Sequence, residues 1–262
     1  MAAPFRRDAT RRPFPLKRPP PFERGAGVRA NHEVMMMNYF DTLLFGVYPY
    51  LAGAVFLLGS LMRFDRDQFT WKAHSSQMLS KENMRLASNL FHIGILLLFA
   101  GHFIGLLTPP EVFHAFGVSA GAKQILAIVA GTIAGVMCFI GLTMLLKRRL
   151  TDPRVRANSS RMDIFILLLL YAQLILGLIT IPVSLMHLDG HNMLNLMGWG
   201  RNIVSFDPAE AVSFISQVSL LFKLHIFLGI TVFLVFPFSR LVHIWSAPVT
   251  YPMRAYQVVR QR

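Results

Sequence analysis

Five apolar stretches of about twenty residues each restrict what this sequence can fold into. They are residues 42–62, 86–107, 125–146, 164–183 and 218–242. A helix that rises about 1.5 Å per residue needs roughly 20 residues to cross a hydrocarbon layer about 30 Å thick. Runs of this length without polar–apolar alternation are typical of helices, not of barrel strands. The sequence therefore predicts an all-α integral membrane protein, a five-transmembrane-helix bundle.

Composition excludes several other classes of protein. The chain has 54% hydrophobic and only 15% charged residues, a composition that excludes an ordinary soluble domain. The net charge is +13, but most basic residues lie between the apolar runs and do not form a soluble basic face, so we expect no nucleic-acid partner. The single cysteine, Cys138, lies inside an apolar run. A disulfide framework and a cysteine-ligated iron–sulfur cluster are therefore excluded within this chain, and metal chemistry must use histidine.

Lysine and arginine are concentrated in alternate connections. Five lie in residues 63–85 and six in 147–161, whereas 108–122 contain none and 184–217 contain only Arg201. Basic residues near helix ends stay on the cytoplasmic side. We therefore expect the N-terminus outside, the C-terminus in the cytoplasm, and a lipid bilayer around the bundle.

The N-terminal region departs from this pattern. Its first 34 residues hold eight Lys or Arg, three acids and six prolines, a composition typical of disorder. A basic segment on the translocated side opposes the orientation rule, and the run Met35–Met36–Met37 offers an alternative start of translation. We predict three regions: a disordered tail or mis-assigned start at 1–36, the helical bundle at 37–246, and a cytoplasmic tail at 247–262.

Four of the nine histidines fall within or at the ends of the apolar runs: His92, His102, His225 and His243. Ionisable side chains inside a membrane are rare and point to function. Their spacings of ten and eighteen residues correspond to about 15 Å and 27 Å of helical rise, so neither same-helix pair can share a metal ion. The other five, which we expect at the surface without a ligand role, are His32, His74, His114, His187 and His191.

The second and fifth predicted helices are antiparallel, which matches the histidines across the bundle. His92 then lies at the inner level of His243, and His102 lies near His225 on the outer side. Two facing histidines can ligate one haem iron, so this placement predicts two b-type haems, one per leaflet. A covalent c-type haem is excluded because the chain lacks CxxCH. The alternative is that each histidine only hydrogen-bonds a neighbouring helix.

From Met37 onward the chain resembles the gamma subunits of respiratory nitrate reductases, which are membrane cytochromes b. The resemblance rests on five segments: YPYLAGAVFLLGS at 48–60, SSQML at 75–79, ASNLFHIGILLLFAGHFIGLLTP at 87–109, LLKRRL at 145–150 and FPFSRLVHIWSAP at 236–248. It implies that His102 and His225 ligate the outer, distal haem, whereas His92 and His243 ligate the inner, proximal one.

The resemblance also implies a function. Quinol, either menaquinol or ubiquinol, would be oxidised on the periplasmic side of the bacterial cytoplasmic membrane. Its electrons would pass through the two b haems to an iron–sulfur beta subunit and then to a molybdenum-containing alpha subunit that reduces nitrate. Inward transfer opposes the membrane potential by about 2.3 kcal/mol per 100 mV, so we expect the inner haem to have the higher potential. No nitrate chemistry would reside in this chain.

Three further residues are candidates for the site. Lys123 matches a family lysine implicated at the quinol site, although a lysine at a helix end can also extend to the membrane interface. Gly101, beside His102, is a second quinol-site candidate, since small residues let a macrocycle or a helix approach closely. Arg240, one turn before His243, could pair with an inner haem propionate or act as a cytoplasmic anchor.

The connections suggest two more features. Residues 193–199 are predicted to form an amphipathic helix that covers the outer site, with a plain spacer as the alternative. Trp71 and Trp245, near the basic loops, could mark a docking face for soluble subunits, although any membrane anchor shows such residues.

Two other functions fit parts of the sequence. One is a dihaem cytochrome b that serves another quinone-linked enzyme, such as a hydrogenase or a heterodisulfide-type reductase; the segment at 236–248 argues against it. The other is a haem-free transporter or anchor, in which the histidines relay protons or pack.

Overall fold

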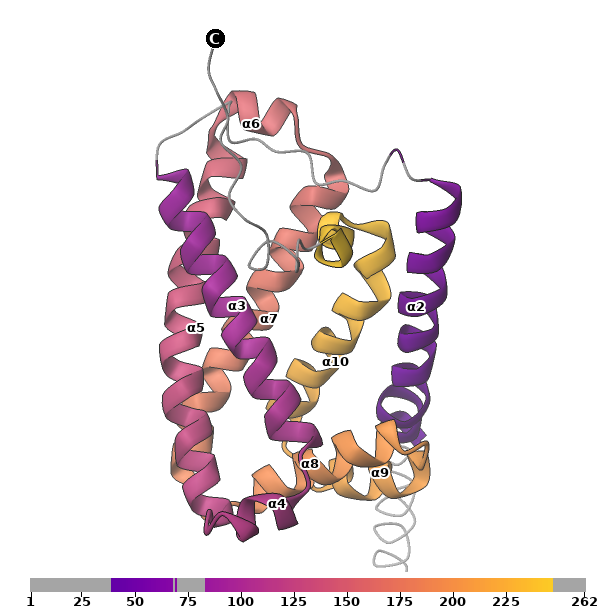
Figure 1. Ribbon diagram of the computed structural model, residues 1–262, viewed down its shortest axis with the longest axis vertical. Coiled ribbons are helices and arrows are strands. Elements are labelled where there is room, and N and C mark those ends of the chain that lie inside the picture. Colours follow the sequence, from indigo (N-terminus) through magenta and orange to yellow (C-terminus); the bar gives the residue numbers. More distant parts are fainter. Residues whose placement is uncertain (1–38, 68, 70–82, 247–262) are drawn as a thin grey trace, which may run out of the picture. The chain divides into compact units, whose positions relative to one another are not determined.

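The computed structural model describes residues 39–67, 69 and 83–246, and within these residues the secondary structure is helical, without strands. Within the same residues, the prediction of five helices that are long and apolar enough to cross a membrane is confirmed (Figure 1). These helical spans are Tyr39–Arg66, Met84–Leu107, Ala120–Thr151, Arg161–Met186 and Leu220–Phe238. The first consists mainly of a π-helical stretch, Thr42–Val47, and α2, Tyr48–Arg66.

The middle three helices are longer than their apolar windows, and polar caps mark where two of them begin. They are α3 (Met84–Leu107), α5 (Ala120–Thr151) and α7 (Arg161–Met186). The Ser119 side chain accepts a hydrogen bond from the Ala122 backbone amide at the start of α5. Ser160 and Asp163 form a reciprocal capping box at the start of α7. Such caps satisfy backbone amides that have no partner within the helix, and a hydropathy window does not register them.

The last helix is shorter than predicted. The prediction of a continuous helix over residues 218–242 is wrong, because α10 (Leu220–Val235) is followed by two 3₁₀ segments, Phe236–Phe238 and Arg240–Ser246. Pro237 has no amide hydrogen and its ring opposes a regular α-helix, which accounts for the break. His243 therefore lies in a 3₁₀ segment, and its distance from His225 cannot be counted in whole α-helical turns.

The helices form a chain of neighbours. α5 packs against both α3 and α7, and α10 packs against both α7 and α2 (Figure 1). The α3–α5 contact is close: a Cβ atom at Gly141 of α5 would overlap the backbone amide nitrogen of Phe91 and the carbonyl oxygen of Ala87. A Cβ at Gly94 of α3 would lie 2.7 Å from Cys138. By contrast, α3 and α10 share little backbone contact in the described part of the chain.

Short helices cover one end of the bundle, which we call the α8 end. It carries α4 (Pro110–Ala115), α8 (His191–Val204) and α9 (Pro208–Ser216). The helix predicted at 193–199 is confirmed within α8, whereas α9 was not predicted. A buried apolar cluster joins α8, α9 and the starts of the first and last spans; its members are Phe45, Trp199, Ala211, Ile215, Val218 and Phe222. Trp199 Nε1 donates a hydrogen bond to the Phe45 carbonyl oxygen at 3.0 Å, so α8 is tied to the π-helical stretch.

The opposite end, which we call the α6 end, carries α6 (Pro153–Ala157) and the helix termini rich in basic residues. Arg63 and Arg66 end α2, and Arg148 and Arg149 lie in the last turn of α5. Several predictions lie outside the described residues: the tails at 1–36 and 247–262, the docking residue Trp71, and the surface positions of His32 and His74.

Candidate functional site

The structure brings the four membrane histidines together in the two predicted pairs. His102 of α3 faces His225 of α10, with ring centroids 6.1 Å apart and ring planes at 46°. His92 of α3 faces His243, with centroids 6.3 Å apart and planes at 74°. The first pair lies nearer the α8 end, close to the last turns of α3 and the first turns of α10, and the second lies nearer the α6 end. The pairing inferred from antiparallel helices is therefore confirmed as geometry.

Three of these imidazoles are held by a backbone carbonyl oxygen. Nδ1 of His92 lies 2.7 Å from the Ser88 oxygen, Nδ1 of His102 lies 2.7 Å from the Leu98 oxygen, and Nδ1 of His243 lies 2.7 Å from the Arg240 oxygen. A carbonyl oxygen can only accept, so Nδ1 carries the hydrogen in each ring. In the neutral imidazole Nε2 is then unprotonated, which is the state required of a metal ligand.

His225 is held differently. Its Nδ1 atom is buried and has no hydrogen-bond partner among the described residues. The ring instead packs over Gly177 of α7, where a Cβ atom would lie only 2.9 Å from Cε1. Gly177 thus makes room for the imidazole between α7 and α10, and this packing helps to position His225.

The ring separations fit a metal ion between the members of each pair. An imidazole nitrogen lies about 2 Å from a bound ion and roughly 1 Å from its ring centroid, so two rings on opposite sides of one ion have centroids about 6 Å apart. Within the described residues, no group of three or more His, Cys, Asp or Glu side chains could hold a metal ion. A group that brings further ligands of its own, such as a haem, would fit a site with two protein ligands.

The space beside the histidines on α3 is open. His92 and His102 are both exposed, and a Cβ atom added at Gly101 or Gly105 would meet nothing within 4 Å. Gly94, in contrast, serves the close contact between α3 and α5. The α3 face that carries the histidines is therefore free to accommodate a large flat group.

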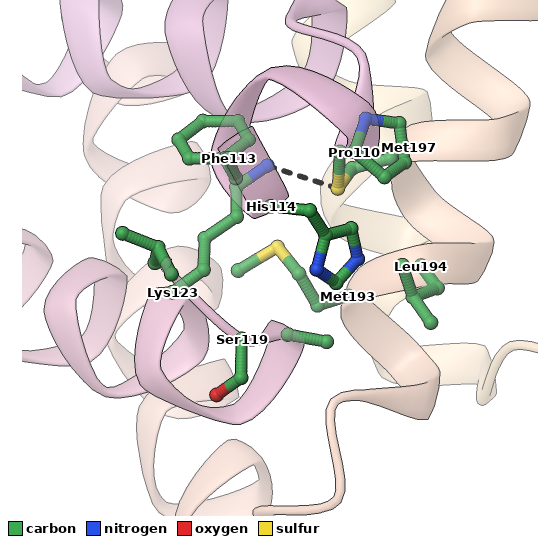
Figure 2. Close-up of a pocket in the computed structure, with 10 residues that line it drawn as sticks. Pro110, Phe113, His114, Ser119, Lys123, Met193, Leu194 and Met197 are labelled. Atoms are coloured by element: carbon green, nitrogen blue, oxygen red, sulfur yellow. Dashed lines mark hydrogen bonds between the residues drawn. The ribbon is translucent and has the colours of Figure 1, made fainter. Parts of the chain in front are cut away.

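A pocket at the α8 end surrounds the Lys123 side chain (Figure 2). Lys123 is only 6% exposed, so its ammonium lies inside the protein and does not extend outward from the helix end. Nζ donates to the Gly105 carbonyl oxygen and contacts the Met197 sulfur, both at 2.9 Å, and it lies 3.8 Å from the centroid of the Phe113 ring. Gly105 is one turn beyond His102, so the ammonium lies close to the His102–His225 pair.

The pocket is formed by two neighbouring segments, α4 and the start of α5, together with α8 from a distant part of the sequence. α4 contributes Phe113 and His114, the start of α5 contributes Lys123, and α8 contributes Met193 and Met197 (Figure 2). It is partly open to solvent. Gly101 is not among the residues that line it. An apolar pocket with one cation at its wall suits a flat, mostly apolar ligand with a polar oxygen.

At the α6 end, Arg240 takes part in a small ionic network. Its guanidinium lies 3.9 Å from the Asp163 carboxylate, which also lies 3.7 Å from Arg149. Arg149 in turn donates to the Ser159 hydroxyl at 2.8 Å. Since the Arg240 backbone carbonyl holds the His243 ring, this network fixes the segment that carries one histidine of the pair.

Two features of the site region were not predicted from the sequence. His114 was expected at the surface without a role, yet it lines the Lys123 pocket. Lys223, two residues before His225, forms a buried ion pair with Asp41 at 2.6 Å. The presence of a lysine inside the last apolar run was a visible signal in the sequence. Its partner Asp41 lies 182 residues away and could not be predicted from the hydropathy pattern.

Comparison with known proteins agrees with this architecture. The model of the nitrate reductase gamma subunit family matches residues 41–262. The respiratory nitrate reductase 1 gamma chain of Escherichia coli (strain K12) is 52% identical over 226 residues, which are 86% of this chain and 100% of that protein. The nitrate reductase gamma chain of Bacillus subtilis (strain 168) is 39% identical over 223 residues, 84% of this chain and 98% of that protein. This chain therefore belongs to the nitrate reductase gamma subunit family.

Proposed function

We propose that this chain is the membrane cytochrome b subunit of a respiratory nitrate reductase. In this role it oxidises quinol on the periplasmic side of a bacterial cytoplasmic membrane and supplies electrons to cytoplasmic partner subunits. Those partners are an iron–sulfur subunit and a molybdenum subunit where nitrate is reduced. The observation that carries the proposal is the pair of facing histidines at each of two levels, with ring centroids 6.1 Å and 6.3 Å apart.

Each pair would hold one b haem by its two Nε2 atoms. His102 and His225 would hold the distal haem, and His92 and His243 the proximal one. When bound, the two haems supply single-electron transfer between the faces of the membrane. The backbone carbonyls of Ser88, Leu98 and Arg240 keep three of the ligands in the required tautomer.

The Lys123 pocket would bind the quinol ring. Two donor positions of the Lys123 ammonium are directed at Gly105 and Met197, which leaves a third for a quinol oxygen. A cation beside that oxygen stabilises the negative charge that develops when the hydroxyl loses its proton. The Phe113 ring and the two methionines provide an apolar surface for the rest of the ring.

The first test is haem content per chain in the purified complex, measured by pyridine haemochrome, in the wild type and five variants. We expect two b haems in the wild type. His102→Gln and His225→Gln are expected to lose the same low-spin signal in electron paramagnetic resonance, and His92→Gln and His243→Gln the other. His191→Gln, at the start of α8 and outside both pairs, is the matched control and keeps both.

Three results would contradict the proposal. Wild-type protein without haem would favour a haem-free transporter or anchor. If haems are present but are not reduced by quinol, the chain is a membrane cytochrome that receives electrons from another donor. Haems that are reduced by quinol, in a complex lacking the molybdenum subunit, would favour another quinone-linked enzyme.

A further inference from the structure

Quinol oxidation at the Lys123 pocket requires a group that accepts protons. A phenolic hydroxyl keeps its proton near neutral pH, because its pKa in water is about 10. An electron leaves the deprotonated oxygen more readily than the neutral hydroxyl. Conversion of one quinol to one quinone releases two protons and two electrons, so the pocket needs a base and a route for protons to the aqueous phase.

Lys123 is already engaged as a hydrogen-bond donor at the wall of the pocket. Its ammonium has only donor positions, and two of them are already directed at the Gly105 oxygen and the Met197 sulfur. Ser119, the other polar residue of the lining, accepts a hydrogen bond from the Ala122 amide as the cap of α5. Apart from these two residues and His114, the lining residues are apolar. His114 is the one imidazole of the lining, and an imidazole can take up a proton at a ring nitrogen and release it again to water.

We propose that His114 is the proton-accepting catalytic residue of quinol oxidation. Its imidazole lines the same pocket as the Lys123 ammonium and is exposed, so it has access both to the ligand and to solvent (Figure 2). The O–H bond of the quinol breaks, a ring nitrogen of His114 takes the proton, and the two electrons leave to the proposed haem pair. His114 then releases the proton to water at the α8 end and is free to take the second one.

The charges around His114 are consistent with this role. Lys123 of α5 is the cationic residue of the pocket lining, and α8 contributes only apolar residues to it, Met193, Leu194 and Met197. Glu111 lies on α4 itself, one turn before His114, and does not line the pocket. The Lys123 ammonium can stabilise the negative charge on the quinol oxygen, while the exposed His114 ring can pass the proton on to water.

The inference rests on the proposed function, and its test uses the complete complex with menadiol as the quinol. His114→Gln is expected to retain both haems but to oxidise menadiol on the order of 100-fold more slowly. In the wild type the rate falls as the pH is lowered, because a protonated imidazole accepts no proton; in the variant this dependence disappears. His187→Gln, at the α8 end but outside the pocket lining, is the matched control and behaves like the wild type.

A second measurement does not depend on turnover. Diethyl pyrocarbonate modifies accessible imidazoles, and mass spectrometry identifies the modified residues. We expect menadione to protect His114 but not His187 in the wild-type complex. Unchanged turnover in His114→Gln, a slower rate with the wild-type pH dependence, or equal modification of His114 with and without menadione would each overturn the assignment.

These outcomes separate the inference from the proposed function. If the wild-type complex contains two haems and oxidises menadiol while His114→Gln is unaffected, only the role of His114 is lost. If the wild type itself neither binds haem nor oxidises menadiol, the proposed function fails, and the role of His114 fails with it.

Discussion

At the scale of single residues, the least expected feature is the ion pair between Lys223 and Asp41. Both side chains are about nine-tenths buried, and the ammonium and carboxylate lie 2.6 Å apart. Replacing Lys223 by Met leaves an uncompensated carboxylate inside the protein, which typically costs about 3–5 kcal/mol. We expect a drop of that order in the free energy of unfolding in mixed micelles.

The control for this prediction is the double variant with Asp41→Asn and Lys223→Met. Removing both charges leaves no unpaired ion, so most of the lost stability is expected to return, as a double-mutant cycle would measure. If the single and double variants lose equal stability, the loss comes from packing and not from the ion pair.

Lys123 offers a second prediction at this scale. Lys123→Met keeps a long apolar stem but removes the ammonium that contacts Gly105, Met197 and Phe113. Because a donor aimed at developing charge typically contributes 10²–10³-fold, we expect menadiol oxidation to slow by about 100-fold, with both haems retained. Lys147→Met is the control, since Lys147 lies exposed near the other end of the same helix. Equal rates in the two variants would remove Lys123 from the site.

At the scale of helices, the α3–α5 contact limits what side chains α5 can carry. A methyl group at Gly141 would overlap the backbone at Ala87 and Phe91, next to His92, and backbone cannot move aside as a flexible side chain can. Gly141→Ala is therefore expected to lower the free energy of unfolding by about 1–3 kcal/mol. Gly131→Ala on the same helix, where a Cβ would meet nothing within 4 Å, is expected to be tolerated.

This pair of variants also tests how α3 is placed. If Gly141→Ala is as stable as Gly131→Ala, α3 and α5 are not in close backbone contact. If the Gly141 variant also loses the haem assigned to His92 and His243 before the other, the α3–α5 contact positions the proximal ligand.

The helices themselves could be predicted better than their ends. Long apolar windows correctly indicated the five spans, because burial in a membrane imposes hydropathy on every turn. The windows missed the caps at Ser119 and Ser160, which are polar and local. They also missed the break at Pro237, since hydropathy averages over a proline, although the proline itself was visible in the sequence.

At the scale of the molecule, the histidine pairs could be predicted and the pocket could not. Antiparallel order along two helices is enough to match His92 with His243 and His102 with His225, and the ring distances agree. The pocket brings together α4, the start of α5 and α8, and their relation depends on how loops of different length fold back on the bundle. For the same reason the sequence did not reveal that His114 lines this pocket or that Asp41 is the partner of Lys223.

The orientation of the whole bundle in the membrane remains a prediction that labelling can test. Basic residues cluster at the α6 end, where Arg154 and Arg156 lie, so we expect this end to face the cytoplasm. Cys138 is buried and is the only cysteine, which makes a Cys138→Ala background suitable for single-cysteine probes. In intact spheroplasts, an impermeant maleimide is expected to label Glu111→Cys at the α8 end, whereas Arg156→Cys reacts only after permeabilisation. The reverse pattern would place the Lys123 pocket on the cytoplasmic side, and protons from quinol oxidation would then be released into the cytoplasm.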